Sequence, residues 1–237
     1  MEKADYGINV RRRFSFGKNP EELYAAAVER LSTIPPPWGL KGLRIKPLPP
    51  IKRNFAVGVS YTRELGAPIK TFGIGFLNRN RNEAPRDDPG GDDTLTVDLN
   101  INHKLIDYGY LVREVLPVYV EAMGAYVMFL DDKNIGIQDA YVIDDQGASR
   151  GRPTYVDFRE GISRIWPANY WDRELCRRAF SLTPDQVVNR LRGHVAEARI
   201  LLDGALVIYS YDRVPDDQIV LIDGKLRPLL QGKLRLV

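Results

Sequence analysis

The stretch that decides the fold is residues 107–130, which read DYGYLVREVLPVYVEAMGAYVMFL. As far as Met123, its apolar side chains recur at spacings of three and four, which places them on one face of a helix. Gly124 stands where a left-handed C-cap belongs, and the continuous apolar run 125–130 is typical of a buried strand. The stretch therefore predicts a long amphipathic helix that leads directly into a core strand. Pro117 has no N–H for a helical hydrogen bond, so we expect a kink there or a later helix start.

Before this stretch, the sequence predicts one helix and a series of strands. Residues 6–16 alternate between apolar and polar side chains, as a strand with one solvated face does. Asn19 and Pro20 are a helix-start signal, and that helix must end before the prolines at 35–37. Three further alternating segments follow in series and predict an antiparallel meander: residues 55–61, 72–76 and 95–101.

After it, the sequence carries helix caps and a hairpin signal. Asn169 is placed to cap a short helix, and Thr183 with Gln186 three residues later forms a capping-box pattern. Asp203-Gly204 separates two apolar runs, which is a strong signal for a two-residue hairpin turn.

These elements predict an α+β fold. We expect an antiparallel sheet of four or five strands with two packed helices, followed by a smaller C-terminal helix–helix–hairpin lobe. The expected division is 1–143 for the sheet lobe, 144–169 for a connecting segment and 170–237 for the C-terminal lobe, unless the whole chain forms one continuous domain.

Composition indicates an ordinary globular protein. The chain has 237 residues, of which 44% are hydrophobic and 27% charged. Its single cysteine, Cys176, excludes an intramolecular disulfide. The sequence has neither the apolar core of a signal peptide near Met1 nor an apolar run of about 18 residues, so we predict a cytoplasmic location and no membrane span.

Charge is distributed unevenly along the chain. Residues 1–85 carry 15 basic and 7 acidic side chains, whereas residues 86–170 carry 8 basic and 15 acidic ones. If these thirds lie apart in space, the resulting dipolar surface can steer a charged partner. If they pack together, they partly neutralise each other.

Candidate catalytic sets are weak. Asp98, Glu114 and Lys104 could serve a magnesium-dependent nuclease, and Cys176 with His194 could form a nucleophile pair, but no motif places either set together. A zinc site would need His103 and His194 together with carboxylates from elsewhere in the chain. We therefore predict no catalytic residue, no metal site and no cofactor.

A basic cluster is also present. The run Arg11-Arg12-Arg13 could bind phosphates, with Phe14 or Tyr61 for stacking, but strand alternation sends Arg12 to the face opposite its two neighbours. We therefore regard nucleic-acid binding as the weaker interpretation.

The acidic middle third carries our functional prediction. It indicates a protein-binding protein, in concrete form an immunity-type inhibitor that occludes a basic partner such as a toxin or nuclease. An enzyme acting on a nucleotide or nucleic acid, and a structural or assembly subunit, are the alternatives. The predicted partner-binding residues are paired aspartates: Asp87, Asp88, Asp92, Asp93, Asp131, Asp132, Asp144 and Asp145.

Overall fold

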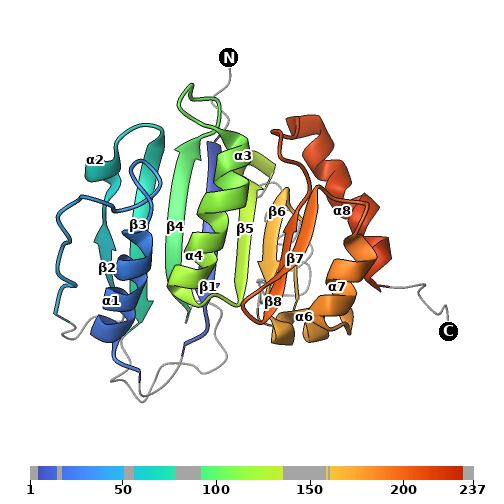
Figure 1. Cartoon of the computed structure of the whole chain (residues 1–237), viewed down its shortest axis with the longest axis horizontal. Helices are drawn as coiled ribbons and strands as arrows, with labels where there is room; N and C mark the ends of the chain where they lie inside the picture. Colours follow the sequence, from blue (N-terminus) through green and yellow to red (C-terminus); the bar gives the residue numbers. More distant parts are fainter. Residues whose placement is uncertain are drawn as a thin grey trace, which may run out of the picture.

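A computed structural model describes residues 5–14, 18–50, 56–77, 92–135, 159 and 161–231. Within them, eight strands form one antiparallel sheet in the order β2-β3-β4-β1-β5-β6-β8-β7, and seven α-helices pack around it (Figure 1). The α+β class agrees with the sequence prediction. The prediction of a four- or five-stranded sheet is wrong, because the C-terminal strands continue the first sheet from its edge at β5.

The first five strands form the wider part of the sheet around β1. β4 pairs with one edge of β1 and β5 with the other, while β3 and β2 extend the sheet beyond β4 as the predicted meander. The alternating side chains Tyr6, Ile8 and Val10 of β1 are buried. The strand bounds are Asp5–Arg12 for β1, Ala56–Ser60 for β2, Ile69–Leu77 for β3, Asp93–Asn100 for β4 and Val127–Asp132 for β5.

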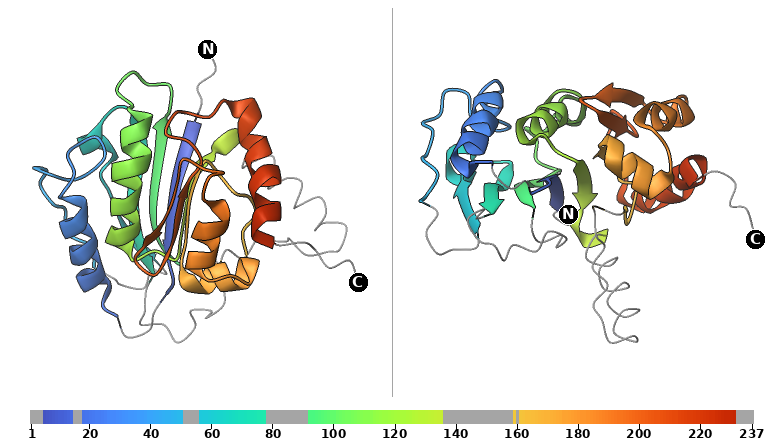
Figure 2. Two further views of the ribbon diagram at one scale, coloured as in Figure 1. Left: turned by 45° about the vertical axis from the view of Figure 1, so that its right-hand side comes forward. Right: turned by 90° about the horizontal axis from the view of Figure 1, so that it is seen from below.

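Helices cover one face of this part of the sheet. Figure 2 shows α1 (Pro20–Leu31) and α4 (Leu116–Met123) side by side on that face. α1 begins as predicted, because the side-chain oxygen of Asn19 accepts the Glu21 N–H at 2.9 Å. A short helix, α2 (Thr62–Leu65), lies between β2 and β3.

The long helix is interrupted close to Pro117. α3 (Tyr108–Tyr110) passes into a π-helical turn, Leu111–Val115, before α4 begins. Pro117 thus lies in the first turn of α4, where a missing N–H is tolerated, and the wider turn before it accommodates the break. α4 ends at Gly124, whose φ of 55° and ψ of 52° confirm the predicted left-handed cap.

The C-terminal third differs from its prediction at Asn169. This residue lies inside β6 (Ala168–Trp171), which pairs with β5 on one side and β8 on the other. The helix that follows, α6 (Arg173–Phe180), is capped instead by Asp172, whose carboxylate accepts the Leu175 N–H at 2.7 Å. Pairing on both edges of β6 outweighs the local capping signal at Asn169.

The other C-terminal predictions hold more closely. The Thr183–Gln186 capping box is formed at the start of α7 (Pro184–Leu191), with N–H to side-chain oxygen distances of 2.9 and 3.3 Å. The hairpin of β7 (Glu197–Leu201) and β8 (Gly204–Ile208) is also present. The chain then forms α8 (Asp216–Gln231), at the end of the molecule opposite α1 (Figure 1).

The hairpin turn lies one residue earlier than predicted. Leu201 pairs with Gly204, so the turn residues are Leu202 and Asp203. Gly204 packs so closely that an added Cβ would lie 2.3 Å from the carbonyl oxygen of Trp171. This close approach places Gly204 inside the strand and forces Leu202 into the left-handed region, with φ 51°.

One hydrophobic core runs beneath both parts of the sheet. The division at residues 143 and 169 stays a prediction, as does the cytoplasmic location. Among the described residues, no helix has the length and apolar character that a bilayer span requires.

Candidate functional site

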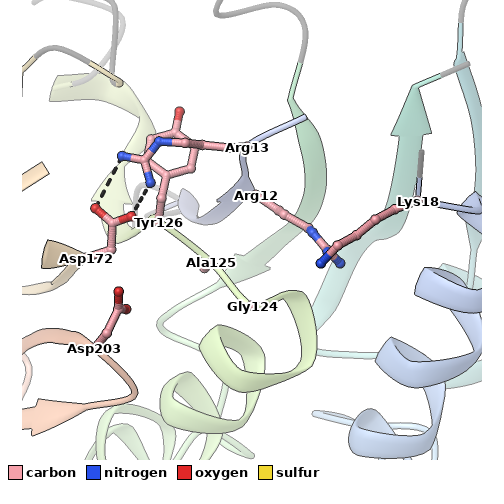
Figure 3. Close-up of a pocket in the computed structure, with 8 residues that line it drawn as sticks. All are labelled: Arg12, Arg13, Lys18, Gly124, Ala125, Tyr126, Asp172 and Asp203. Atoms are coloured by element: carbon pink, nitrogen blue, oxygen red, sulfur yellow. Dashed lines mark hydrogen bonds and ion pairs between the residues drawn. The ribbon is translucent and has the colours of Figure 1, made fainter. Parts of the chain in front are cut away.

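A charged pocket lies where β1 ends, between the C-terminus of α4 and the start of α6. Its volume is about 260 Å³. Basic side chains come from the end of β1 and the residues after it, and acidic ones come from the N-cap of α6 and the β7–β8 turn (Figure 3). The lining residues are Arg12, Arg13, Lys18, Gly124, Ala125, Tyr126, Asp172 and Asp203.

Arg13 is the fixed element of this pocket. Its guanidinium forms two hydrogen bonds to the Asp172 carboxylate, one of them at 3.2 Å between Nη2 and Oδ1. Its Nε lies 3.8 Å from a carboxylate oxygen of Glu174, and its guanidinium carbon lies 4.3 Å from the centre of the Tyr126 ring. Asp172 is itself held by capping α6. The Arg13 side chain therefore joins the end of β1 to the start of α6.

A buried ion pair, Asp92–Arg159, holds the Tyr126 side chain that lines the pocket. The Tyr126 hydroxyl donates to Asp92 Oδ2 at 2.6 Å, and Arg159 donates to Asp92 Oδ1 from Nε at 3.1 Å and from Nη2 at 2.6 Å. Burial raises the pKa of Asp92, while the bonds from Tyr126 and Arg159 oppose that rise. Asp92, one of the predicted partner-binding residues, thus anchors the Tyr126 ring on which Arg13 stacks.

Charged side chains also line the two opposite sides of the pocket. The charged ends of Arg12 and Lys18 point toward one another on one side, and Asp203 lies on the other side (Figure 3). Asp203 accepts a hydrogen bond from the Tyr170 hydroxyl at 3.3 Å. Because Arg13 and Asp172 neutralise each other, the pocket offers a positive wall and a smaller negative wall.

The hairpin turn that supplies Asp203 also carries an exposed aliphatic side chain. Leu202 is next to Asp203 in the hairpin turn and is 54% exposed, and Ile200 on β7 is 42% exposed. Only a small number of large apolar side chains have this much exposure among the described residues. The turn therefore carries an exposed apolar side chain directly next, in sequence, to an aspartate that lines the pocket.

The other predicted partner-binding residues fall into three groups. Asp93 and Asp132 are buried; Asp93 accepts the Leu77 N–H at 3.2 Å, and Asp132 accepts the Asn134 N–H at 2.8 Å. Asp131 is partly buried over Gly7. The remaining four lie outside the described residues: Asp87, Asp88, Asp144 and Asp145.

Asp131 lies in a row of residues that crosses three strands. Gly7 of β1 pairs with Asp98 on one side and with Asp131 on the other. The Asp131 carboxylate accepts a bond of 3.2 Å from the Asn9 side-chain amide. Burial first of all, together with the nearby Asp98 charge, raises the pKa of Asp131 to about 7.

The weak catalytic sets are not assembled as such. Asp98 pairs with Lys133 at 2.6 Å, and Glu114 and Lys104 are exposed. Cys176 is buried beside the Trp171 carbonyl, and burial raises the pKa of its thiol to about 12, whereas His194 is exposed. No group of three or more His, Cys, Asp or Glu side chains in the described ranges could hold a metal ion.

The basic cluster differs from its prediction in one respect. Arg12 and Arg13 both reach the pocket because β1 ends at Arg12, so strand alternation no longer separates them. Tyr61, considered for stacking, is buried and bonded to the Tyr24 hydroxyl at 2.6 Å. Sequence reasoning missed Asp172 and Leu202. A capping aspartate before an Arg-Glu pair is a signal for the first, but no local signal marks the second.

Comparisons with known proteins identify no family. No family model matches the chain, and no curated protein does. Among solved structures, the Pseudomonas aeruginosa T6SS protein PA0821 is similar, with 13% identity and a TM-score of 0.49 over 97% of this chain and 75% of that chain. A likeness at this level carries no argument about function.

Proposed function

We propose that this chain is a protein-binding protein of the immunity type, which occludes a partner's functional surface, and that the end of the sheet around the charged pocket is its contact surface. The observation that carries the proposal is Leu202. A leucine in the left-handed region costs about 1–2 kcal/mol, and two-residue hairpin turns normally place Gly, Asn or Asp there. At 54% exposed, the side chain gains little from the fold in return.

Strain with exposure indicates a role outside the folded monomer. A partner that covered the Leu202 side chain would gain its burial, as apolar anchors do in protein interfaces. The pocket beside it would supply the polar rim, with Arg12 and Lys18 facing acidic groups of the partner and Asp203 a basic one. Such a contact favours a partner surface that carries both charges.

Only some of the predicted aspartates remain candidates for the contact with a partner. Asp92, Asp93 and Asp132 are buried and engaged within the chain, so they support the fold around the pocket and contribute no contact atoms. The predicted acidic contacts for a basic partner that remain are the partly buried Asp131 and four residues outside the described ranges: Asp87, Asp88, Asp144 and Asp145.

The direct experiment uses the proteins encoded beside this chain in its genome of origin. Each is expressed alone and together with this chain, and growth of the host and co-purification are measured. We expect one neighbour to inhibit growth alone, to lose that effect with this chain, and to bind it with a Kd below about 1 μM. The proposal is refuted if every neighbour is harmless or if none binds.

A substitution at Leu202 separates binding from folding. Leu202→Asn suits the left-handed turn, so we expect the free energy of unfolding to rise by about 1 kcal/mol, while partner affinity falls at least about tenfold. Leu105→Asn is the matched control, since Leu105 is 58% exposed beyond the end of β4 that lies away from the pocket. Unchanged affinity in Leu202→Asn would place the contact elsewhere.

A nucleotide-directed enzyme is the second candidate, and the basic wall of the pocket favours it. Against it, Arg13 already occupies one face of the Tyr126 ring, which leaves that face closed to a base. Titration calorimetry with inorganic phosphate and with nucleoside triphosphates decides between the two. Binding of a nucleotide below about 100 μM, abolished by Lys18→Glu, would favour the enzyme.

A further inference from the structure

The outer face of α8 is exposed and has its own pattern. Val220 and Leu221 are 44% and 52% exposed, while the opposite face of the helix buries Ile219, Ile222, Leu226 and Leu230. On the outer face, residues four apart form two neighbouring rows. Asp217, Leu221 and Lys225 form the first row, and Val220, Gly224 and Pro228 form the second.

Neither close packing nor backbone conformation within the monomer explains why position 224 is a glycine. A Cβ added there would meet nothing within 4 Å, and no left-handed φ is required. A glycine inside a helix lowers stability relative to alanine, so its presence calls for a packing or functional reason. The glycine leaves a notch in the second row, directly beside Leu221.

Pro228 adds a polar group to this notch. Proline has no N–H, so the carbonyl of Gly224, four residues earlier, receives no helical hydrogen bond from position 228. The notch therefore lies at a point where the hydrogen-bond ladder of the helix lacks one bond.

The first row is complementary to itself. When two copies of a helix pack antiparallel about a two-fold axis, residues at equal distances before and after the axis face each other. With the axis at Leu221, Asp217 of one copy faces Lys225 of the other, about 6 Å along the helix on either side. Gln218 of one copy likewise lies level with Gly224 of the other.

We propose that the outer face of α8 binds a second copy of this chain, as an antiparallel helix pair in which the two Leu221 side chains meet at the axis, beside the notches that Gly224 of each copy leaves. Two Asp217–Lys225 ion pairs flank the apolar centre. Lys225 now reaches only the Tyr209 hydroxyl, at 3.4 Å, among its described contacts. The surface uses none of the pocket residues, so it is independent of the function proposed above.

The experiment is sedimentation velocity on the full chain across about 1–200 μM. A single helix pair buries less than a standard interface, so we expect a dimer with a Kd in the micromolar range. Asp217→Lys and Lys225→Asp should each raise that Kd at least about tenfold, and the double variant should restore it to within about threefold, because the pairs reform with reversed sign.

Gly224→Ala distinguishes this contact from a folding effect. Alanine improves the helix, so the Tm of the monomer should rise by about 2–4 °C, while the methyl group fills the notch and raises the dimer Kd at least about tenfold. A wild-type chain that is monomeric at about 200 μM overturns the proposal. So does a dimer whose Kd is unchanged in Gly224→Ala, or one that the charge-swapped double variant does not restore.

Discussion

Asp131 gives the sharpest physical prediction, because the pKa of its carboxyl group lies close to neutral pH. Its pKa is raised from an ordinary 3.8 to about 7, chiefly by burial over Gly7. In the unfolded chain the same group ionises near its ordinary value. Between those two pH values the native state binds more protons than the unfolded state, so stability falls as pH rises from about 4 to about 7.

The magnitude follows from the shift. Each pKa unit corresponds to about 1.4 kcal/mol, so the full effect has an upper bound of about 4 kcal/mol. Because Asp131 keeps some contact with solvent, we expect about 2 kcal/mol. Asp131→Asn reproduces the shape of the neutral acid and keeps an oxygen for the Asn9 amide, so it removes this loss.

The assay is urea unfolding, followed by tryptophan fluorescence, at a series of pH values from about 4 to about 8. The free energy of unfolding of Asp131→Asn minus that of wild type should be close to zero at pH 4 and grow to about 2 kcal/mol above pH 7. Asp212→Asn, at an exposed position, is the control and should show no such growth. A difference that stays constant across the series would refute the reasoning.

Three further predictions concern buried groups. Arg159→Met leaves its carboxylate partner buried without a counter-charge, so urea unfolding should show a loss of about 3–5 kcal/mol. Gly204→Ala drives a methyl group against the carbonyl of Trp171 and should cost about 3 kcal/mol by the same measurement, whereas Gly73→Ala, with nothing within 4 Å of the new Cβ, should change stability by less than about 0.5 kcal/mol. The Cys176 thiol, whose pKa burial raises to about 12, should resist a thiol reagent in native protein and react only in urea; reaction at equal rates in both would contradict its burial.

Local signals in the sequence were reliable where residues close in sequence determine the structure. The predicted caps at Asn19 and Gly124 and the Thr183 capping box are present, because each is satisfied by atoms a few residues away.

Predictions failed where strand partners that are distant in sequence determine the structure. Asn169 reads as a helix cap, yet hydrogen bonds from two strands fix it in β6, and neither strand adjoins it in sequence. The sheet was underestimated for the same reason, since nothing local shows that β6 joins β5.

The candidate site was the least predictable part. Paired aspartates look alike in sequence, but Asp92 is buried under an arginine 67 residues away. Arg12 and Arg13 share a pocket only because β1 stops between them. Leu202 became visible as a strained residue once the hairpin register was known, and that register depends on the packing of Gly204 against β6.

The central position of β1 has a consequence for how the chain is made. β1 leaves the ribosome before both of its neighbours, because it pairs Asp5 with Asn100 of β4 and Arg11 with Val127 of β5. At 5–20 residues per second, the roughly 120 residues in between take about 6–25 s to synthesise. Until β5 is made, at least one edge of β1, which carries Ile8 and Val10, lacks the strand that covers it in the finished fold. The nascent chain therefore spends many seconds with its central strand incompletely paired. A chaperone that binds exposed strand edges would protect the chain most during this interval, and a stalled ribosome would prolong the exposure.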